Sequence, residues 1–536
     1  MKKISSVFII FILVASIQSQ TTIANLDELK KTYPDLKVYN EKTINLLGYR
    51  LIQAGKIKEA IGVFKLNTEL YPDSWNTYDS LGEAFMVSGD KEEAIKYYTK
   101  SVQINPDNTN GLNMLEKLRR PSTLKEEYSV EELQEDFLQF RRHIEEIFPH
   151  PYEFTSEESF DRLFQAQYEK ITEPMSLLEF YRLLAPLKGN IGCGHTHLDY
   201  PEEYRREVQV QKFPLVLTFL ENKCFVLKDL NEDSTLPLFS EILTINGVGI
   251  GGIAGTLRSE ISADGNNPFF KTSALENCFQ YYYANHFGVP KEFKIEYRSD
   301  EDGDIHEAVI PAIPCSGINY SNREAKDLDV RVFPQKNTAV LTIDSFSYYE
   351  ERNKIFFAFV DKAFSRIKEE NIKNVILDLR GNGGGDPFCA SYLWSYLERE
   401  PYPYFAEPYG KYAELSKPIK QAENHFTGDL FILIDGSNFS TTGHFCSKVK
   451  YHDRGTFIGT ETGGTYTCNA AVRVFPLKNT KIGLKIATGS FAAAVEGFPK
   501  DRGIIPEYPV KSKLDDLKSG KDTVMDYALN LIANIN

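Results

Sequence analysis

Residues 375–386, VILDLRGNGGGD, decide the fold of the last two hundred residues. They join a continuous apolar run to a glycine-rich turn, and a second apolar run, LFILIDG at 430–436, leads to a polar turn and a helical pattern. Continuous apolar runs of this length are typical of strands covered on both faces. Strands and helices alternate along residues 327–536, which predicts an α/β core with its chemistry at the carboxyl ends of the strands.

Ser440 is the candidate nucleophile, because it follows the second strand at the start of a predicted helix, where backbone N–H groups face an anion. A serine hydroxyl attacks a carbonyl when a base is within reach and donors face the oxyanion that forms. The candidate donors are the N–H groups of Thr441 and of the glycine turn, at Gly384 or Gly385. Helix capping by Ser437 or Ser440 is the alternative.

The run CGHTHL offers His195 and His197 beside Cys193. Alternating positions of a strand share a face, so a metal site is one interpretation. A catalytic zinc takes three protein ligands, however, and the run favours a general base, so no metal is predicted. His444, four residues after Ser440, is a rival base whose side chain is expected to point along the helix.

Composition excludes several classes of function. The chain has 536 residues and a formal net charge of −14, with no concentrated basic stretch, so a nucleic-acid partner is not predicted. The glycine turn lacks a Gly-Lys-Ser/Thr ending, and a GxGxxG-like run at 247–252 lacks a ribose-binding acid. No nucleotide or other cofactor is therefore expected.

The N-terminus is typical of exported proteins. Lys2 and Lys3 precede an apolar run at 7–15 and the small, polar SIQSQ, which predicts a signal peptide over residues 1–19. The run is shorter than the ~20 residues that cross a bilayer, so no membrane span is expected. The mature protein is predicted to be periplasmic or secreted. Its seven cysteines form no CxxC pair, and most are expected to be buried small hydrophobes.

A 34-residue period within residues 26–118 predicts tetratricopeptide repeats. The recurring residues are Gly48, Gly55, Ala60 and Pro72, repeated as Gly82, Gly89, Ala94 and Pro106. The repeats either hold a protein partner or serve as a spacer against the next domain. Helical periodicity then fills residues 127–202, and short β-like runs fill residues 205–316.

In order and wording these segments resemble the family of tail-specific, or C-terminal processing, proteases and their tricorn-type relatives. The motifs that carry the resemblance are FYRLLAPLKGNIGCGHTHL, SEILTING, VILDLRGNGGGD and RGIIPEYPV. They look like the family's Asp-Gly-His-Thr segment, PDZ domain, Leu-Asp-Leu-Arg-x-Asn-x-Gly-Gly strand and Gly-Val-x-Pro-Asp tail. The resemblance implies a multidomain α/β protein: after the repeats, a helical cap over 127–202 ending in the GHT motif, a PDZ-like β module over 205–316, and a ClpP/crotonase-like catalytic core over 327–536.

The resemblance also implies roles for single residues. Ser440, five residues after Asp435, stands at the family's nucleophile. Tail-specific members use a lysine where this chain has Thr465, so the tricorn-type arrangement with an upstream histidine fits better, and that histidine is His195. Gly443 stands where many members carry a glutamate.

The third catalytic residue comes, in tricorn-type members, from the segment before the final motif. Asp501 is the choice and Glu496 the alternative. Gly194 departs from the pattern, because tricorn has an assisting serine there.

The function that the resemblance implies is a serine-type peptidase, acting through an acyl-enzyme without cofactor. The PDZ-like module would bind the C-terminus of a peptide or protein substrate by strand addition, with its carboxylate near Gly247. Activity would fall as the pH drops through about 6.5, the ordinary pKa of histidine. The alternative is a catalytically silent protein of the same fold that binds a peptide or an apolar ligand, as the retinoid-binding relatives do.

Overall fold

The computed structural model describes residues 25–34, 36, 38–53, 56–119, 124–231, 236–315 and 328–535. Two compact units are present, one of Met1–Ser122 with Pro314–Asn319 and one of Thr123–Ile313 with Tyr320–Asn536. The predicted signal peptide lies outside the described residues. Among those described, no helix has the length and apolar character to cross a bilayer. The seven cysteines form no disulfide, and five of them are buried, as predicted.

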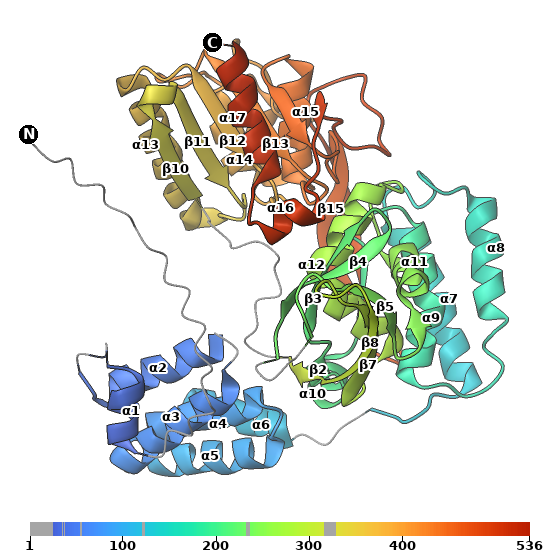
Figure 1. The fold of residues 1–536 in the computed structure, drawn as a ribbon. Coiled ribbons are helices and arrows are strands. Elements are labelled where there is room, and N and C mark those ends of the chain that lie inside the picture. Colours follow the sequence, from blue (N-terminus) through green and yellow to red (C-terminus); the bar gives the residue numbers. More distant parts are fainter. Residues whose placement is uncertain are drawn as a thin grey trace, which may run out of the picture. The chain divides into compact units, whose positions relative to one another are not determined.

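The first unit is a series of helix pairs (Figure 1). A ring of one helix packs on a glycine of the preceding helix, and the same contact recurs one repeat later. An added Cβ at Gly48 would lie 2.4 Å from the Phe64 ring, and one at Gly82 would lie 3.0 Å from the ring of Tyr98. This is the close approach that the 34-residue period predicts. The helices are α1 (Leu26–Thr32), α2 (Glu41–Gln53), α3 (Ile57–Leu70), α4 (Trp75–Val87), α5 (Lys91–Ile104) and α6 (Thr109–Arg119).

Three helices begin the second unit: α7 (Val130–Ile147), α8 (Glu157–Tyr168) and α9 (Leu177–Asn190). Capping boxes at Ser129 and Ser176 start α7 and α9, since each serine accepts from the backbone N–H three residues on. The helices share a core with the hairpin β15 (Thr467–Pro476) and β16 (Gly483–Ala492). The short β1 (His197–Asp199) pairs antiparallel with β16, which fixes the histidine segment to that hairpin.

A β module follows, with the strand order β3-β4-β5-β7-β8 and β6 paired to β5. Its strands are β3 (Leu215–Leu220), β4 (Lys223–Asp229), β5 (Glu241–Ile245), β6 (Val248–Gly249), β7 (Glu292–Arg298) and β8 (Ile305–Pro311), and its helices are α11 (Ile250–Glu260) and α12 (Pro268–Phe287). Short elements flank it: α10 (Glu202–Glu207), β2 (Gln211–Lys212) and β9 (Ile313–Pro314). The PDZ-like identity of this module and the helical-cap identity of α7–α9 stay predictions.

Side chains of α12 cover the β3 edge of this sheet. Gln280 Nε2 donates to the Leu215 carbonyl at 2.6 Å, and Glu276 Oε1 accepts from the Phe219 N–H at 2.7 Å. An added peptide strand at this edge would need these same backbone groups. Strand addition at β3 therefore requires the Glu276 and Gln280 side chains to move away.

The core of the second unit is a six-stranded sheet in the order β10-β11-β12-β13-β14-β17, in which only the β10–β11 pair is antiparallel. Its strands are β10 (Leu328–Phe333), β11 (Thr338–Ile343), β12 (Asn374–Asp378), β13 (Asp429–Ile434), β14 (Thr456–Gly459) and β17 (Tyr508–Pro509). Helices α13 (Asn353–Glu369), α14 (Pro387–Ser395) and α15 (Thr441–Tyr451) pack on one face. On the other face lies α17 (Thr523–Ile535), drawn in red across the sheet in Figure 1, preceded by α16 (Leu514–Lys518).

Both apolar runs of the sequence are buried strands. Leu377 and Ile432 face the cluster of α13–α15, whereas Ile376 and Leu433 face α17. Every residue of β12 is buried. The prediction of an α/β core with strands covered on both faces is confirmed.

Candidate active site

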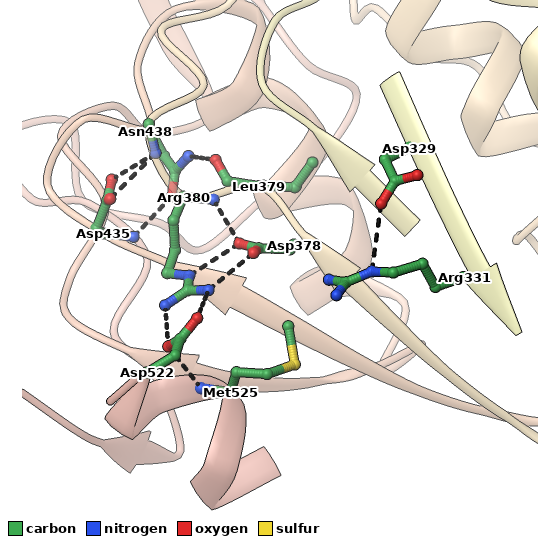
Figure 2. Close-up of polar contacts among 10 residues, drawn as sticks. Asp329, Arg331, Asp378, Leu379, Arg380, Asp435, Asn438, Asp522 and Met525 are labelled. Atoms are coloured by element: carbon green, nitrogen blue, oxygen red, sulfur yellow. Dashed lines mark hydrogen bonds and ion pairs between the residues drawn. The ribbon is translucent and has the colours of Figure 1, made fainter. Parts of the chain in front are cut away.

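The site lies where β12 and β13 end side by side. The two strands are parallel and Asp378 pairs with Leu433, so the glycine turn and the serine turn leave the sheet at the same edge. Asn438 joins the two turns, because its Nδ2 donates to the Leu379 carbonyl and its Oδ1 accepts from the Asp435 N–H (Figure 2). These bonds hold the two turns at a fixed distance from each other.

Ser440 precedes α15 with φ 55° and ψ −125°, a conformation that is strained for any residue except glycine. Its side chain forms no capping hydrogen bond, so helix capping does not explain this serine. An added Cβ at Gly384 would lie 2.9 Å from Ser440 Cβ and 3.0 Å from the Thr441 nitrogen. The structure thus brings the predicted nucleophile and the glycine turn into direct contact.

The predicted oxyanion donors differ in their availability. The Gly384 N–H donates to Asn382 Oδ1 at 2.9 Å and is therefore already engaged. Thr441 is the first residue of α15, so its N–H has no acceptor within the helix. Gly385, at φ 141°, continues the turn, and its carbonyl accepts from the Thr441 hydroxyl at 2.7 Å. Of the three candidates, Thr441 has an N–H that the helix leaves without an acceptor, whereas that of Gly384 is engaged.

His195 lies beside the nucleophile segment. Its ring packs on Phe439, the residue before Ser440, with 4.8 Å between centroids. Burial lowers the pKa of His195 to about 4, and the Asn469 carbonyl opposes that shift. The imidazole is consequently neutral at physiological pH, as a general base must be, and the expected loss of the base form near pH 6.5 moves to lower pH. Its Nδ1 is buried and has no partner among the described residues.

Burial also lowers the pKa values of the other two histidines of the prediction. His197 belongs to β1 and pairs with Lys485, and burial lowers its pKa to about 3. His444 is buried with its ring edge-on to Phe405, and burial lowers its pKa to about 3 as well. Neither ring nitrogen of His444 has a partner in the described part of the chain.

Thr465 fills the place where tail-specific members carry a lysine. It is 2% exposed, and its hydroxyl donates to the Pro499 carbonyl at 3.2 Å. Gly443, where many members carry a glutamate, lies against Thr465, because an added Cβ there would be 2.8 Å from the Thr465 nitrogen. The Thr465 backbone therefore leaves no room for a side chain at position 443. A serine–lysine dyad cannot form here.

Asp501 and Glu496, the two predicted orienting carboxylates, are both exposed. Within the described ranges neither forms a hydrogen bond or an ion pair. Asp501 packs instead against Gly265, where an added Cβ would meet its Cβ at 2.6 Å. The structure shows no link between either carboxylate and His195.

Sequence reasoning missed two buried residues of the site. Cys468, on β15, is buried beside Ser440, whose side chain partly offsets the rise that burial causes in the pKa of the thiol. Asp264 accepts the Gly194 N–H at 2.9 Å through Oδ1, next to His195. In the sequence, Asp264 belongs to an Asp-Gly pair, which indicates only a turn.

Comparison with protein families gives two matches. Residues 337–510 match Peptidase family S41, and residues 75–108 match the tetratricopeptide repeat. The first match spans the core from β11 to the end of β17 and includes Ser440. No curated protein matches the sequence.

Solved structures resemble most of the chain at low sequence identity. Mature CPAF has a TM-score of 0.56 and 14% identity, over 76% of this chain and 98% of CPAF. CPAF complexed with lactacystin has a TM-score of 0.55 and 12% identity, over 76% and 99% of the two chains. The photosystem II D1 C-terminal processing protease has a TM-score of 0.38 and 13% identity, over 73% and 98%. At these identities the CPAF likeness concerns the fold.

Proposed function

We propose that this chain is a serine-type peptidase in which Ser440 cleaves peptides or proteins through an acyl-enzyme. The match of residues 337–510 to Peptidase family S41 supports the proposal. The observation that carries the proposal is the strained backbone of Ser440 at the N-terminus of α15, in contact with Gly384. Strain of this kind persists where the surrounding structure enforces it, and it exposes the hydroxyl beside the helix N-terminus.

The reaction has two stages. Ser440 Oγ bonds to the peptide carbonyl carbon while His195 takes the hydroxyl proton, and the N–H groups of Thr441 and Gly385 donate to the oxyanion. Collapse breaks the C–N bond, and His195 returns the proton to the leaving amine. Water then attacks the acyl-enzyme by the same proton route and releases the second product.

The setting of this activity is also part of the proposal. The sequence of residues 1–19 supports export, so we place the peptidase in the periplasm or outside the cell. The repeats supply a second surface for a protein partner. Since side chains of α12 cover the β3 edge, addition of a substrate strand at that edge depends on displacement of Glu276 and Gln280.

A fluorophosphonate probe tests the nucleophile. The wild-type protein should be labelled at neutral to mildly alkaline pH, and Ser440→Ala should not. Ser437→Ala is the matched control: this serine lies in the same turn, and its Oγ accepts from Asn277 Nδ2 at 3.1 Å. Labelling that persists in Ser440→Ala, or is absent from the folded wild type, rules out the proposed nucleophile.

A further inference from the structure

We propose that Asp264, rather than Asp501 or Glu496, is the carboxylate that positions His195 during the reaction. The inference rests on the proposed function, since it concerns the base of the same site. Asp264 lies between α11 and α12, on a chain segment that the family motifs do not include. Three observations support its role: its attachment to the histidine loop, the unpaired polar atoms beside that attachment, and the charged groups around it.

Three residues of the segment 262–267 are bonded to the end of α9 and to the residues between α9 and His195. Ser262 Oγ donates to the Lys188 carbonyl at 3.2 Å, and the Gly265 N–H donates to the Gly192 carbonyl at 3.0 Å. Between them, Asp264 Oδ1 accepts the Gly194 N–H at 2.9 Å. The carboxylate therefore sits directly against the residue before His195.

The same segment is bonded to the core. Asn267 Nδ2 donates to the Thr462 carbonyl at 2.9 Å, on the loop that leads to β15. Asp264 thus has a fixed position relative to both the base and the nucleophile, as an orienting residue requires.

Two buried polar atoms flank the Gly194 bond without partners in the described ranges: Asp264 Oδ2 and His195 Nδ1. Asp264 is 5% exposed. Leaving a buried polar group unsatisfied is unfavourable, so a contact between these two atoms removes a penalty that both now carry. Catalytic hydrogen bonds are often long in the free enzyme and tighten when substrate binds.

A bond from Nδ1–H to Asp264 Oδ2 has a chemical consequence. It fixes the tautomer in which the Nε2 lone pair is available for the Ser440 proton. Once Nε2 carries that proton, the imidazolium lies beside a carboxylate that stays ionised. The proton then leaves from Nε2 to the amine, and Asp264 neither gains nor loses a proton during the cycle.

The groups that face Asp264 come from several elements. They are Glu153, which pairs with Lys500 at 2.6 Å, and the thiols of Cys193 and Cys468. Asp501 packs on the neighbouring Gly265. Burial raises the pKa of Asp264 to about 7, whereas burial holds the pKa of His195 near 4. From pH 5.5 to 8, then, His195 stays neutral while Asp264 becomes ionised, and a rate that needs the carboxylate must rise over this window.

Asp264→Asn in the full-length protein tests the inference, with the labelling rate of the fluorophosphonate probe measured from pH 5.5 to 8. The amide oxygen can still accept the Gly194 N–H, so a purely structural role is preserved. The expected result is a labelling rate lower by about 100-fold or more at pH 8, with the wild-type rise with pH lost. Thermal unfolding of both proteins checks that the variant is folded.

Asp501→Asn is the competing variant, and Asp73→Asn, on an exposed residue of the repeat unit, controls for a surface substitution. An Asp264→Asn protein that keeps the wild-type rate and pH profile overturns the inference, as does a loss confined to Asp501→Asn. Absent labelling of the wild type is a different result, because it contradicts the proposed function itself.

Discussion

At Gly384 the backbone has φ 105° and lies against the turn that holds Ser440. An alanine there is strained in backbone conformation, and its Cβ would approach the Phe439 oxygen to 2.7 Å. We expect Gly384→Ala to displace Ser440 and Thr441 and to lower kcat by about 100-fold or more, the size of effect seen when an oxyanion donor is lost. The measurement is turnover of a peptide substrate, with probe labelling for comparison.

Gly383→Ala is the matched control one residue earlier. An added Cβ at Gly383 meets no atom within 4 Å, and its φ is not in the left-handed region. It should keep activity within about twofold. Equal losses in both variants would show that the turn as a whole, and not the contact of Gly384 with the nucleophile, is sensitive.

Some residues of the site can be recognised from the sequence, and others cannot. Ser440 and the glycine turn can be recognised because each directly follows its own strand, so local pattern places them. Asp264 and Cys468 reach the site only through tertiary packing, and nothing in their neighbourhood marks them. The order of the motifs predicts Asp501, but motif order carries no information on the exposure of its side chain.

Among the elements, the end of β12 is tied to the start of α17 by Arg380. Its guanidinium binds Asp378 at 2.8 Å and Asp522 at 2.7 Å, as Figure 2 shows. The Asp378 side chain is only 4% exposed. Arg380→Ala removes this cation from a buried carboxylate and should lower the free energy of unfolding by about 3 kcal/mol, measured by urea denaturation.

The pair Arg331–Asp329 on β10 provides the comparison in the same figure. Both side chains are largely solvent-accessible, at 48% and 40%, and the N–O distance is 3.2 Å. Arg331→Ala should therefore change the free energy of unfolding by less than about 1 kcal/mol. If Arg380→Ala and Arg331→Ala lower the free energy of unfolding by similar amounts, burial does not explain the strength of the Arg380 ion pair.

An element can be predicted from the sequence where its burial follows a simple pattern along the chain. The runs that became β12 and β13 are apolar throughout because helices cover both faces, so the sequence indicates them clearly. The hairpin β15–β16 mixes buried and exposed positions. The third strand of its sheet is β1, which comes from a distant part of the chain. Strands that are this far apart in the sequence carry no local pattern that predicts their pairing. The contact of α12 side chains with β3 cannot be predicted from local sequence either.

For the whole molecule, the two units have separate hydrophobic cores, so each should unfold in its own transition. Gly48→Ala tests this, because its Cβ would overlap the ring of Phe64, which is 0% exposed and cannot move aside without repacking. Overpacking of this kind costs about 1–3 kcal/mol, which in a unit of this size should lower the transition temperature of the repeats by about 5 °C or more.

Differential scanning calorimetry measures both transitions, and the labelling rate at Ser440 reports the second unit. The transition of the peptidase unit and its labelling should stay at wild-type values. Gly82→Ala provides a graded control, since its Cβ stays 3.0 Å from the Tyr98 ring and the shift should be smaller. If Gly48→Ala moves both transitions or slows labelling, the repeats stabilise the peptidase unit directly, and independent unfolding is wrong.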